Sequence, residues 1–165
     1  IGKGCYIPTG HKNFKNLDET KILKILKPYL EDKSIKKIGQ NIKFDYIIFN
    51  KRGININSLE DTMLMSYVLD AGKNRHNMDT LAEIHLGHKT IQFKDLVGTG
   101  KKQINFSEVD VNIAKDYAAE DADITYRLYK NFIKSLKEEN LLNIYEIFEK
   151  QLVKILAKME IEVIK

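Results

Sequence analysis

The stretch AKDYAAEDADITYRLY, residues 114–129, places a tyrosine and an aspartate four residues apart, at Tyr117 and Asp121. On a helix this spacing puts both side chains on one face, one turn apart. Asn41 and Asp45 repeat the spacing earlier in the chain. Carboxylates from two helices that meet at one pocket suit Mg²⁺, which prefers oxygen ligands. Two such ions can activate a water and stabilise the leaving oxygen of a phosphodiester, so the pattern is compatible with metal-dependent hydrolysis.

Ordinary surface charge is the competing interpretation of Asp45 and Asp121, and spacing alone favours it. Other motifs carry less information. GTGKKQ, residues 98–103, lacks the spacing of a phosphate-binding loop. The histidines come without a second cysteine or a ligand spacing typical of zinc, so they are expected at the surface as His76, His85 and His88.

Composition limits the class of protein. The chain has 165 residues, of which 43% are hydrophobic, and this is enough to bury the core of one folded domain. One cysteine excludes an internal disulfide framework and fits a reducing compartment. No apolar run reaches the roughly 20 residues that a membrane helix needs. The chain begins without methionine and without a signal-peptide pattern, so it is expected to be a piece of a longer protein.

The net charge of +4 is compatible with a polyanionic partner. Most of the basic residues are lysines, in a chain also rich in isoleucine and asparagine, which is typical of an AT-rich genome. The number of lysines is therefore weak evidence by itself.

Hydrophobic spacing predicts an alternation of strands and helices, and hence an α/β protein. Strands are expected at residues 5–10, 34–39 and 54–61. Helices are expected at residues 18–32, with Asp18 as N-cap, at 40–53, 62–70, 78–87 and 107–136, and from 140 onward. Residues 92–106 are expected to form a loop, and the SEVD pattern at 107–110 is expected to open the long helix.

Three segments together resemble a known family. They are IGQNIKFDYIIFNKRGI, DTMLMSYVLDAGKNRHNMDTLAEIHLGHKTIQFKDLVGTGKKQINF and YAAEDADITYRLY. Their order and spacing resemble the proofreading 3′–5′ exonuclease domain of bacterial family A DNA polymerases, the DNA polymerase I family, from about Tyr6 to Lys165. The resemblance implies a ribonuclease H-like fold, with a mixed sheet flanked by helices.

The resemblance also implies a site built from four acidic residues and a tyrosine. Asp45 matches the aspartate of the second motif, and Tyr117 and Asp121 match the tyrosine and aspartate of the third. Asp45 and Asp121 would be metal ligands for two ions, Mg²⁺ or Mn²⁺, with Zn²⁺ possible at one site, and Tyr117 would orient the attacking water. Asp116, Glu120 and Asp123 are then expected on the exposed side of the helix at residues 107–136 or in local pairs.

Further residues match positions that hold the DNA strand in this family: Gln40, Asn41, Phe44, Arg75 and Phe93. Phe44 stands where the family frequently has a tyrosine, so the ring is kept for stacking and a hydroxyl is lost. The expected substrate is the single-stranded 3′ end of DNA.

The first motif of the family, an Asp-x-Glu on the first strand, has no counterpart in residues 1–165. The chain is therefore expected to lack the first strand or strands of the fold. Residues 1–140 would be the truncated exonuclease domain, and residues 141–165 a helix leading into the polymerase domain of the same parent chain. The fragment alone is expected to be nearly inactive.

The expected function is removal of mispaired 3′ nucleotides during DNA replication and repair, in the bacterial cytoplasm near the nucleoid and away from membranes. Two alternatives remain at this point. One is a catalytically inactive structural domain of a polymerase, and the other is a related 3′–5′ exoribonuclease.

Overall fold

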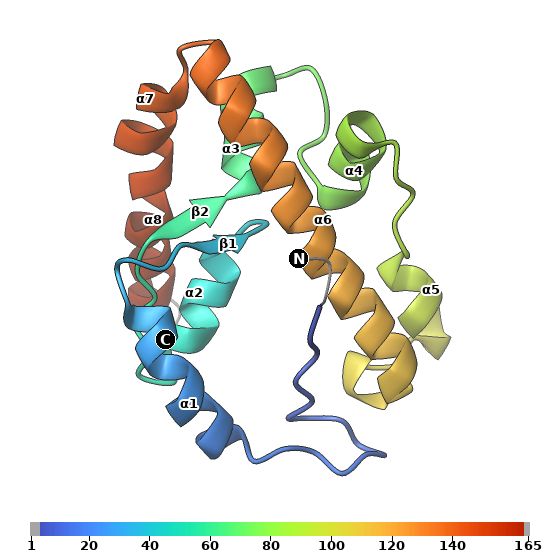
Figure 1. Ribbon diagram of the computed structural model, residues 1–165. Helices are drawn as coiled ribbons and strands as arrows, with labels where there is room; N and C mark the ends of the chain where they lie inside the picture. Colours follow the sequence, from blue (N-terminus) through green and yellow to red (C-terminus); the bar gives the residue numbers. More distant parts are fainter. Residues whose placement is uncertain (1–3, 164–165) are drawn as a thin grey trace.

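The computed structural model describes residues 4–163 and confirms an α/β protein that is mostly helical (Figure 1). Its main elements are α1 (Glu19–Glu31), β1 (Lys37–Gly39), α2 (Lys43–Asn50), β2 (Leu59–Asp61), α3 (Thr62–Asp70), α4 (Met78–Leu86), α5 (Phe93–Val97), α6 (Val111–Glu138), α7 (Leu142–Ile144) and α8 (Lys150–Val163). Short 3₁₀ turns cover Gly100–Lys102 and Phe106–Glu108, and a π-helical segment covers Tyr145–Glu149.

β1 and β2 form a small parallel sheet, with α2 in the connection between them. Gly39, the last residue of β1, faces Asp61 of β2 in the pairing register. A Cβ at Gly39 would come within 2.8 Å of the Ile42 side chain, so only glycine fits where the chain turns from β1 towards α2. This tight turn brings the end of β1 close to the start of α2.

The long helix α6 runs diagonally across the molecule and packs against α3 and α4 (Figure 1). Asp110 caps its N-terminus by accepting a hydrogen bond from the backbone N–H of Asn112. The largest core cluster lies along α6, with partners from α3, α4 and the π-helical segment: Met65, Leu81, Ala82, Ile124, Leu128, Phe132, Leu136 and Tyr145. Burial of this apolar face holds α6 against the rest of the domain.

A second cluster joins α2 to α8, and a third lies beside α5 and the N-terminal end of α6. The second cluster consists of Ile42, Tyr46, Ile56, Leu59, Val153 and Ala157. The third is smaller and consists of Val97, Val109 and Ala114. The elements that carry Asp45 and Asp121, α2 and α6, are therefore each anchored by a core of their own.

Several boundaries differ from those expected from the sequence. Residues 5–10 are not a strand, because within the described chain no strand lies beside them to complete a ladder. Residues 92–106 include α5 and a 3₁₀ turn rather than one loop. α6 starts at Val111 because Asp110 is its cap, whereas Glu108 and Asn105 form a capping box on the preceding 3₁₀ turn.

The expected C-terminal helix is present, with a π-helical segment between α7 and α8. Asp18 caps α1 by accepting from the Lys21 N–H, as the sequence predicted. Gly87 ends α4 in the left-handed conformation, with φ of 60°. No helix within residues 4–163 combines the length and apolar character that a membrane crossing requires.

Candidate active site

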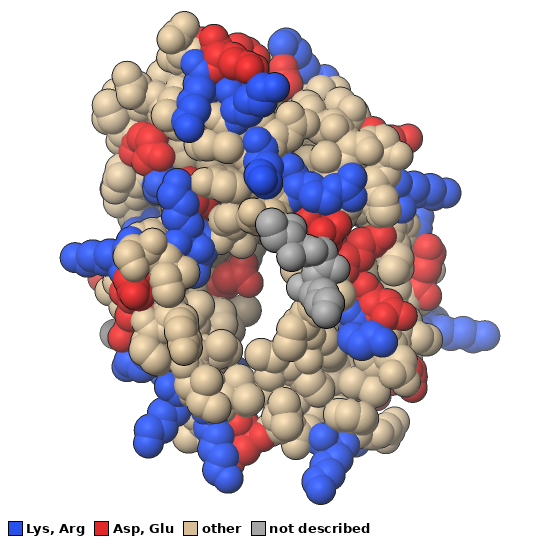
Figure 2. All heavy atoms as spheres, in the orientation of Figure 1, with Lys and Arg blue, Asp and Glu red and all other residues tan. Residues whose placement is uncertain are grey.

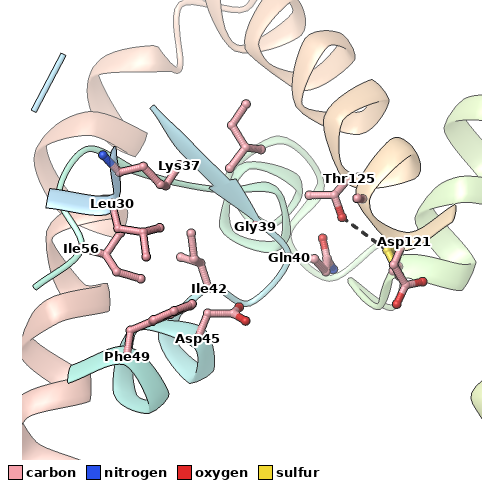
Figure 3. Close-up of a pocket in the computed structure, with 13 residues that line it drawn as sticks. Leu30, Lys37, Gly39, Gln40, Ile42, Asp45, Phe49, Ile56, Asp121 and Thr125 are labelled. Atoms are coloured by element: carbon pink, nitrogen blue, oxygen red, sulfur yellow. Dashed lines mark hydrogen bonds between the residues drawn. The ribbon is translucent and has the colours of Figure 1, made fainter. Parts of the chain in front are cut away.

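A pocket of about 490 Å³ lies between α2, the end of β1 and α6. Asp45 lines it from α2 and Asp121 from α6, together with Gly39 and Gln40 at the end of β1. Figure 2 shows the molecule hollowed beside α2, and Figure 3 shows Gln40 between the two carboxylates. The tertiary structure thus brings both aspartates to one pocket, although they come from helices far apart in the sequence.

Tyr117 and Asp121 lie one turn apart on α6, as their spacing predicted. Desolvation raises the pKa of Asp121 to about 6; the Tyr117 hydroxyl opposes this effect, and the charges of Glu120 and Asp79 add to it. Desolvation, with the Asp121 charge adding, also raises the pKa of Tyr117, which therefore stays protonated at neutral pH. Oδ1 of Asp121 is buried without a hydrogen-bond partner within residues 4–163. Such an oxygen is costly unless a ligand or cation satisfies it.

Asp45 lies in the first turn of α2, where the helix dipole favours a negative charge. Desolvation on the pocket wall nevertheless raises its pKa, with its own backbone N–H opposing the effect. Both pocket aspartates therefore hold their charge at a cost in this structure. A bound cation would favour the ionised form of each.

Asp61 is a third important carboxylate, and sequence reasoning missed its role. Its side chain accepts from the N–H groups of Asn41 at 2.9 Å, Ile42 at 3.0 Å and Met63 at 2.9 Å. It thereby caps α3 and holds the turn that leads into α2. Burial raises its pKa, and these backbone N–H groups oppose that shift. An aspartate directly before the helical TMLMSYVLD was the N-cap signal that could have identified it.

Asn41 does not share a helix with Asp45, contrary to the expectation from their spacing. It has a φ of 57° and precedes α2, which begins at Lys43. The reason is that the Asp61 carboxylate accepts a hydrogen bond from the backbone N–H of Asn41 and keeps Asn41 in the turn that precedes the helix. Asn41 nevertheless lies next to the pocket, because the adjacent residue Gln40 lines it.

Gln40 and Phe44 differ in how free their side chains are. Gln40 lines the pocket, but its amide nitrogen donates to the His76 carbonyl at 2.8 Å and its oxygen accepts from the Thr62 hydroxyl. Phe44 is 57% exposed, and the Lys43 ammonium lies 5.3 Å from its ring centroid. Phe44 is thus available for stacking, whereas Gln40 is held in place by the domain itself.

An aromatic cluster of Phe93, Phe106 and Tyr117 lies next to the pocket end of α6. The Phe93 and Phe106 rings are nearly parallel, at 19°, with centroids 6.0 Å apart, and the Tyr117 ring lies 6.0 Å from each. Phe93 is 47% exposed and offers a ring to a ligand. Arg75 lies in the exposed segment between α3 and α4.

The neighbouring acids of α6 have other partners. Asp116 lies 3.2 Å from the Lys115 ammonium, and Asp123 lies 3.6 Å from Arg127. Glu120 binds the His88 ring at 2.8 Å and, through its other oxygen, the Ile91 N–H at 2.7 Å. Glu120 therefore anchors the α4–α5 segment rather than pointing into solvent.

His76, His85 and His88 are half-buried, which corrects the expectation that they lie at the surface. His76 contacts the Ser66 hydroxyl at 3.0 Å, and His85 packs edge-on against Phe132. Within residues 4–163, no three His, Cys, Asp or Glu side chains are grouped so that they could hold a metal ion. The pocket itself offers the two carboxylates Asp45 and Asp121, whose oxygens are of the kind that Mg²⁺ prefers.

Comparison with known proteins identifies a family for nearly the whole chain. Residues 2–137 match the family model described as 3′-5′ exonuclease. The chain is 43% identical over 169 residues to DNA polymerase I of Rhizobium leguminosarum and 39% identical over 166 residues to DNA polymerase I of Pseudomonas aeruginosa. It is 36% identical to DNA polymerase I of Borreliella burgdorferi over 159 residues.

Each of these three matches covers 96% of this chain. In contrast, they cover only 17%, 18% and 17% of the respective relatives. The chain therefore spans less than a fifth of the length of these curated relatives. The mostly helical α/β architecture with its small parallel sheet is consistent with the ribonuclease H-like exonuclease fold.

Proposed function

The chain belongs to the 3′–5′ exonuclease family found in bacterial DNA polymerase I, and from this premise we propose that it hydrolyses the 3′-terminal phosphodiester of a DNA strand. The observation that carries the proposal is the pocket between Asp45 and Asp121, where a buried Asp121 oxygen has no partner among the described residues. Removal of mispaired nucleotides during replication and repair is the role that such a reaction would serve.

Mg²⁺ or Mn²⁺ is the proposed cofactor, with Asp45 and Asp121 as ligands and Zn²⁺ as a further option at one position. Bound metal would supply Lewis-acid stabilisation of the charge that develops on the phosphodiester. The described residues contribute two carboxylates to this pocket, so a two-ion site would need further oxygen ligands, including those of the substrate phosphate.

Tyr117 has a role that follows from its protonation state. Tyrosine keeps its proton at neutral pH, and desolvation raises the pKa of Tyr117 further, so its hydroxyl can donate a hydrogen bond to a water or to the scissile phosphate beside Asp121. It would act by positioning, without binding a metal itself. The aromatic cluster around Tyr117 limits the movement of its ring.

Strand binding would come from exposed rings and a cation around the pocket. Phe44 and Phe93 are exposed side chains, and bases stack on aromatic rings with little regard to sequence. Arg75 would contact phosphate from the α3–α4 segment. Gln40 and Asn41 would shape the pocket at the end of β1. A single-stranded 3′ end is the substrate that fits these contacts.

The names of the curated relatives suggest which domain lies beside this one. Curated relatives are named DNA polymerase I, and we infer that this domain works beside a polymerase domain in its parent chain. The boundary near residue 140 stays a prediction. A cytoplasmic, nucleoid-associated location in a bacterium is inferred from the same relationship.

Digestion of a labelled single-stranded oligonucleotide tests the proposal. In a polymerase chain that contains residues 1–165, Mg²⁺-dependent and EDTA-sensitive release of 3′ nucleotides is expected. Asp45→Ala and Asp121→Ala should each lower the rate by several orders of magnitude, because each removes charge stabilisation in the transition state. Polymerisation should remain nearly unchanged.

Asp116→Ala and Asp123→Ala are matched controls on α6, since both carboxylates pair with neighbouring cations outside the pocket. An equal loss of rate in these controls would mean that the catalytic carboxylates do not lie on the pocket face of α6. Absence of EDTA-sensitive digestion by the parent chain would instead favour an inactive structural domain. Chain 1–165 alone should digest the strand weakly, because residues 4–163 bring only Asp45 and Asp121 as carboxylates to the pocket.

A further inference from the structure

A second hollow, of about 500 Å³, lies where the start of β1 and the edge of β2 meet the first turns of α8. We call it the lysine hollow; the charged side chains that line it are Lys33, Lys36, Glu60, Glu146, Lys150 and Lys154. It shares no lining residue with the pocket of Asp45 and Asp121. Figure 2 shows Lys and Arg side chains gathered on the side of the molecule where α8 and the start of β1 lie.

The inner wall of the lysine hollow is electrically balanced. Glu60 is 1% exposed and accepts from the Tyr145 hydroxyl at 3.1 Å and from the Lys150 ammonium at 3.0 Å, while the Lys36 ammonium lies 3.2 Å away. Lys150 also pairs with Glu146 at 2.9 Å. Two carboxylates therefore neutralise two lysines, and the buried pairing holds both ammonium groups in place.

Lys33 and Lys154, which also line the lysine hollow, and Lys158, one turn further along α8, carry positive charge that no carboxylate of the described chain balances in this way. Among the ion pairs formed by residues 4–163, none involves Lys33, Lys154 or Lys158. The Lys154 ammonium donates to the neutral Asn57 side chain at 3.1 Å. Burial lowers the pKa of Lys154, and the charges of Lys158, Lys33 and Lys37 lower it further. These like charges are close enough to repel one another, so an anion would be stabilised there.

The spacing of the cations follows the helix. Lys150, Lys154 and Lys158 are four residues apart on α8, and so about 6 Å apart along its axis. Each strand of duplex DNA presents a phosphate about every 3.4 Å along the axis, so the rise of about 6 Å from Lys154 to Lys158 is short enough for both ammonium groups to reach phosphates of one strand. Lysine also contacts phosphate as a point charge, without the fixed geometry that arginine imposes.

We propose that Lys33, Lys154 and Lys158 form a contact site for the phosphodiester backbone of DNA, separate from the pocket of Asp45 and Asp121. The choice of DNA rests on the proposed function. An acidic protein surface fits less well, because Leu59 is the one apolar side chain that lines the hollow and protein interfaces have an apolar centre. A strand held here would be bound without regard to its sequence.

The test measures DNA binding by chain 1–165 in EDTA, so that hydrolysis does not interfere. Fluorescence anisotropy with a labelled single strand and a labelled duplex is recorded over a range of KCl concentrations. Lys154→Gln with Lys158→Gln removes two phosphate contacts, so the slope of log K against log salt should become shallower by about 1.4 for the single strand or about 1.8 for the duplex. Lys33→Gln, in an exposed turn, should give about half of that change.

The matched control is Lys130→Gln with Lys137→Gln, which removes the same charge from exposed positions on α6. Unchanged slopes in the Lys154 and Lys158 pair, or an equal change in the control pair, would overturn the proposal. The proposal would also be wrong if millimolar inorganic phosphate abolished the difference between parent and variant, since the site would then take free phosphate. Loss of digestion by the parent chain with the slope difference intact would refute the proposed hydrolysis alone.

Discussion

Replacing Asp121 by asparagine should stabilise the folded chain at neutral pH, although it removes one of the two pocket carboxylates. The pKa of Asp121 is raised from 3.8 to about 6, mainly by desolvation. A difference of about 2 units corresponds to about 3 kcal/mol if fully expressed. Because the pocket is open to solvent, screening should reduce the gain to about 1 kcal/mol.

The pH window follows from the direction of the shift. Between about pH 4 and pH 6 the folded state keeps a proton on Asp121 that the unfolded state has released. The free energy of unfolding of the unsubstituted chain 1–165 therefore falls as the pH rises through this window. Below pH 4 both states are protonated at this residue, so the parent and Asp121→Asn should have similar stability. Above pH 6 the variant should be more stable by a constant amount.

Urea unfolding of chain 1–165 at a series of pH values from 4 to 8, without divalent metal, measures this difference. Asp123→Asn is the matched control, since it removes the same charge from an exposed position two residues away. It should show no comparable step between pH 4 and pH 6. Parallel curves for the parent and Asp121→Asn across the window would refute the reasoning, because they would mean that the pocket does not desolvate the carboxylate.

Other variants test the tyrosine and the buried carboxylates. Tyr117→Phe should lower the rate of single-turnover hydrolysis by the polymerase that contains this chain by roughly 10- to 10³-fold, with unchanged affinity for the strand. The free energy of unfolding should fall by about 1 kcal/mol. Weaker binding with a normal rate would instead make Tyr117 a strand contact. Asp61→Ala should cost about 3 kcal/mol in urea unfolding, because three backbone N–H groups lose their acceptor; a near-neutral result would contradict its capping role. Lys150→Met should cost about 2 kcal/mol, because the buried carboxylate of Glu60 would keep only Lys36 as an ionic partner among residues 4–163, whereas Lys134→Met, from an exposed pair, should change little.

Local sequence signals identified most helices and their caps. Apolar spacing and the N-cap Asp18 placed α1, and Gly87 placed the end of α4, because a cap needs only a few neighbouring residues. The strand expected at residues 5–10 failed for the opposite reason. A strand needs a partner that is remote in the sequence, and apolar spacing does not say whether that partner is present.

The sequence by itself determined the α/β class, the family and the placing of Tyr117 and Asp121 one turn apart, since these depend on order and spacing along the chain. Only the tertiary structure decided that Asp45 lines the same pocket as Asp121, that Asp61 holds Asn41 outside α2, and that Glu60 is buried against Tyr145 and Lys150. The physical reason is that burial and capping between elements depend on which side chains, distant in the sequence, come into contact. Helical periodicity shows which face of a helix is apolar, but it does not show which element packs against that face.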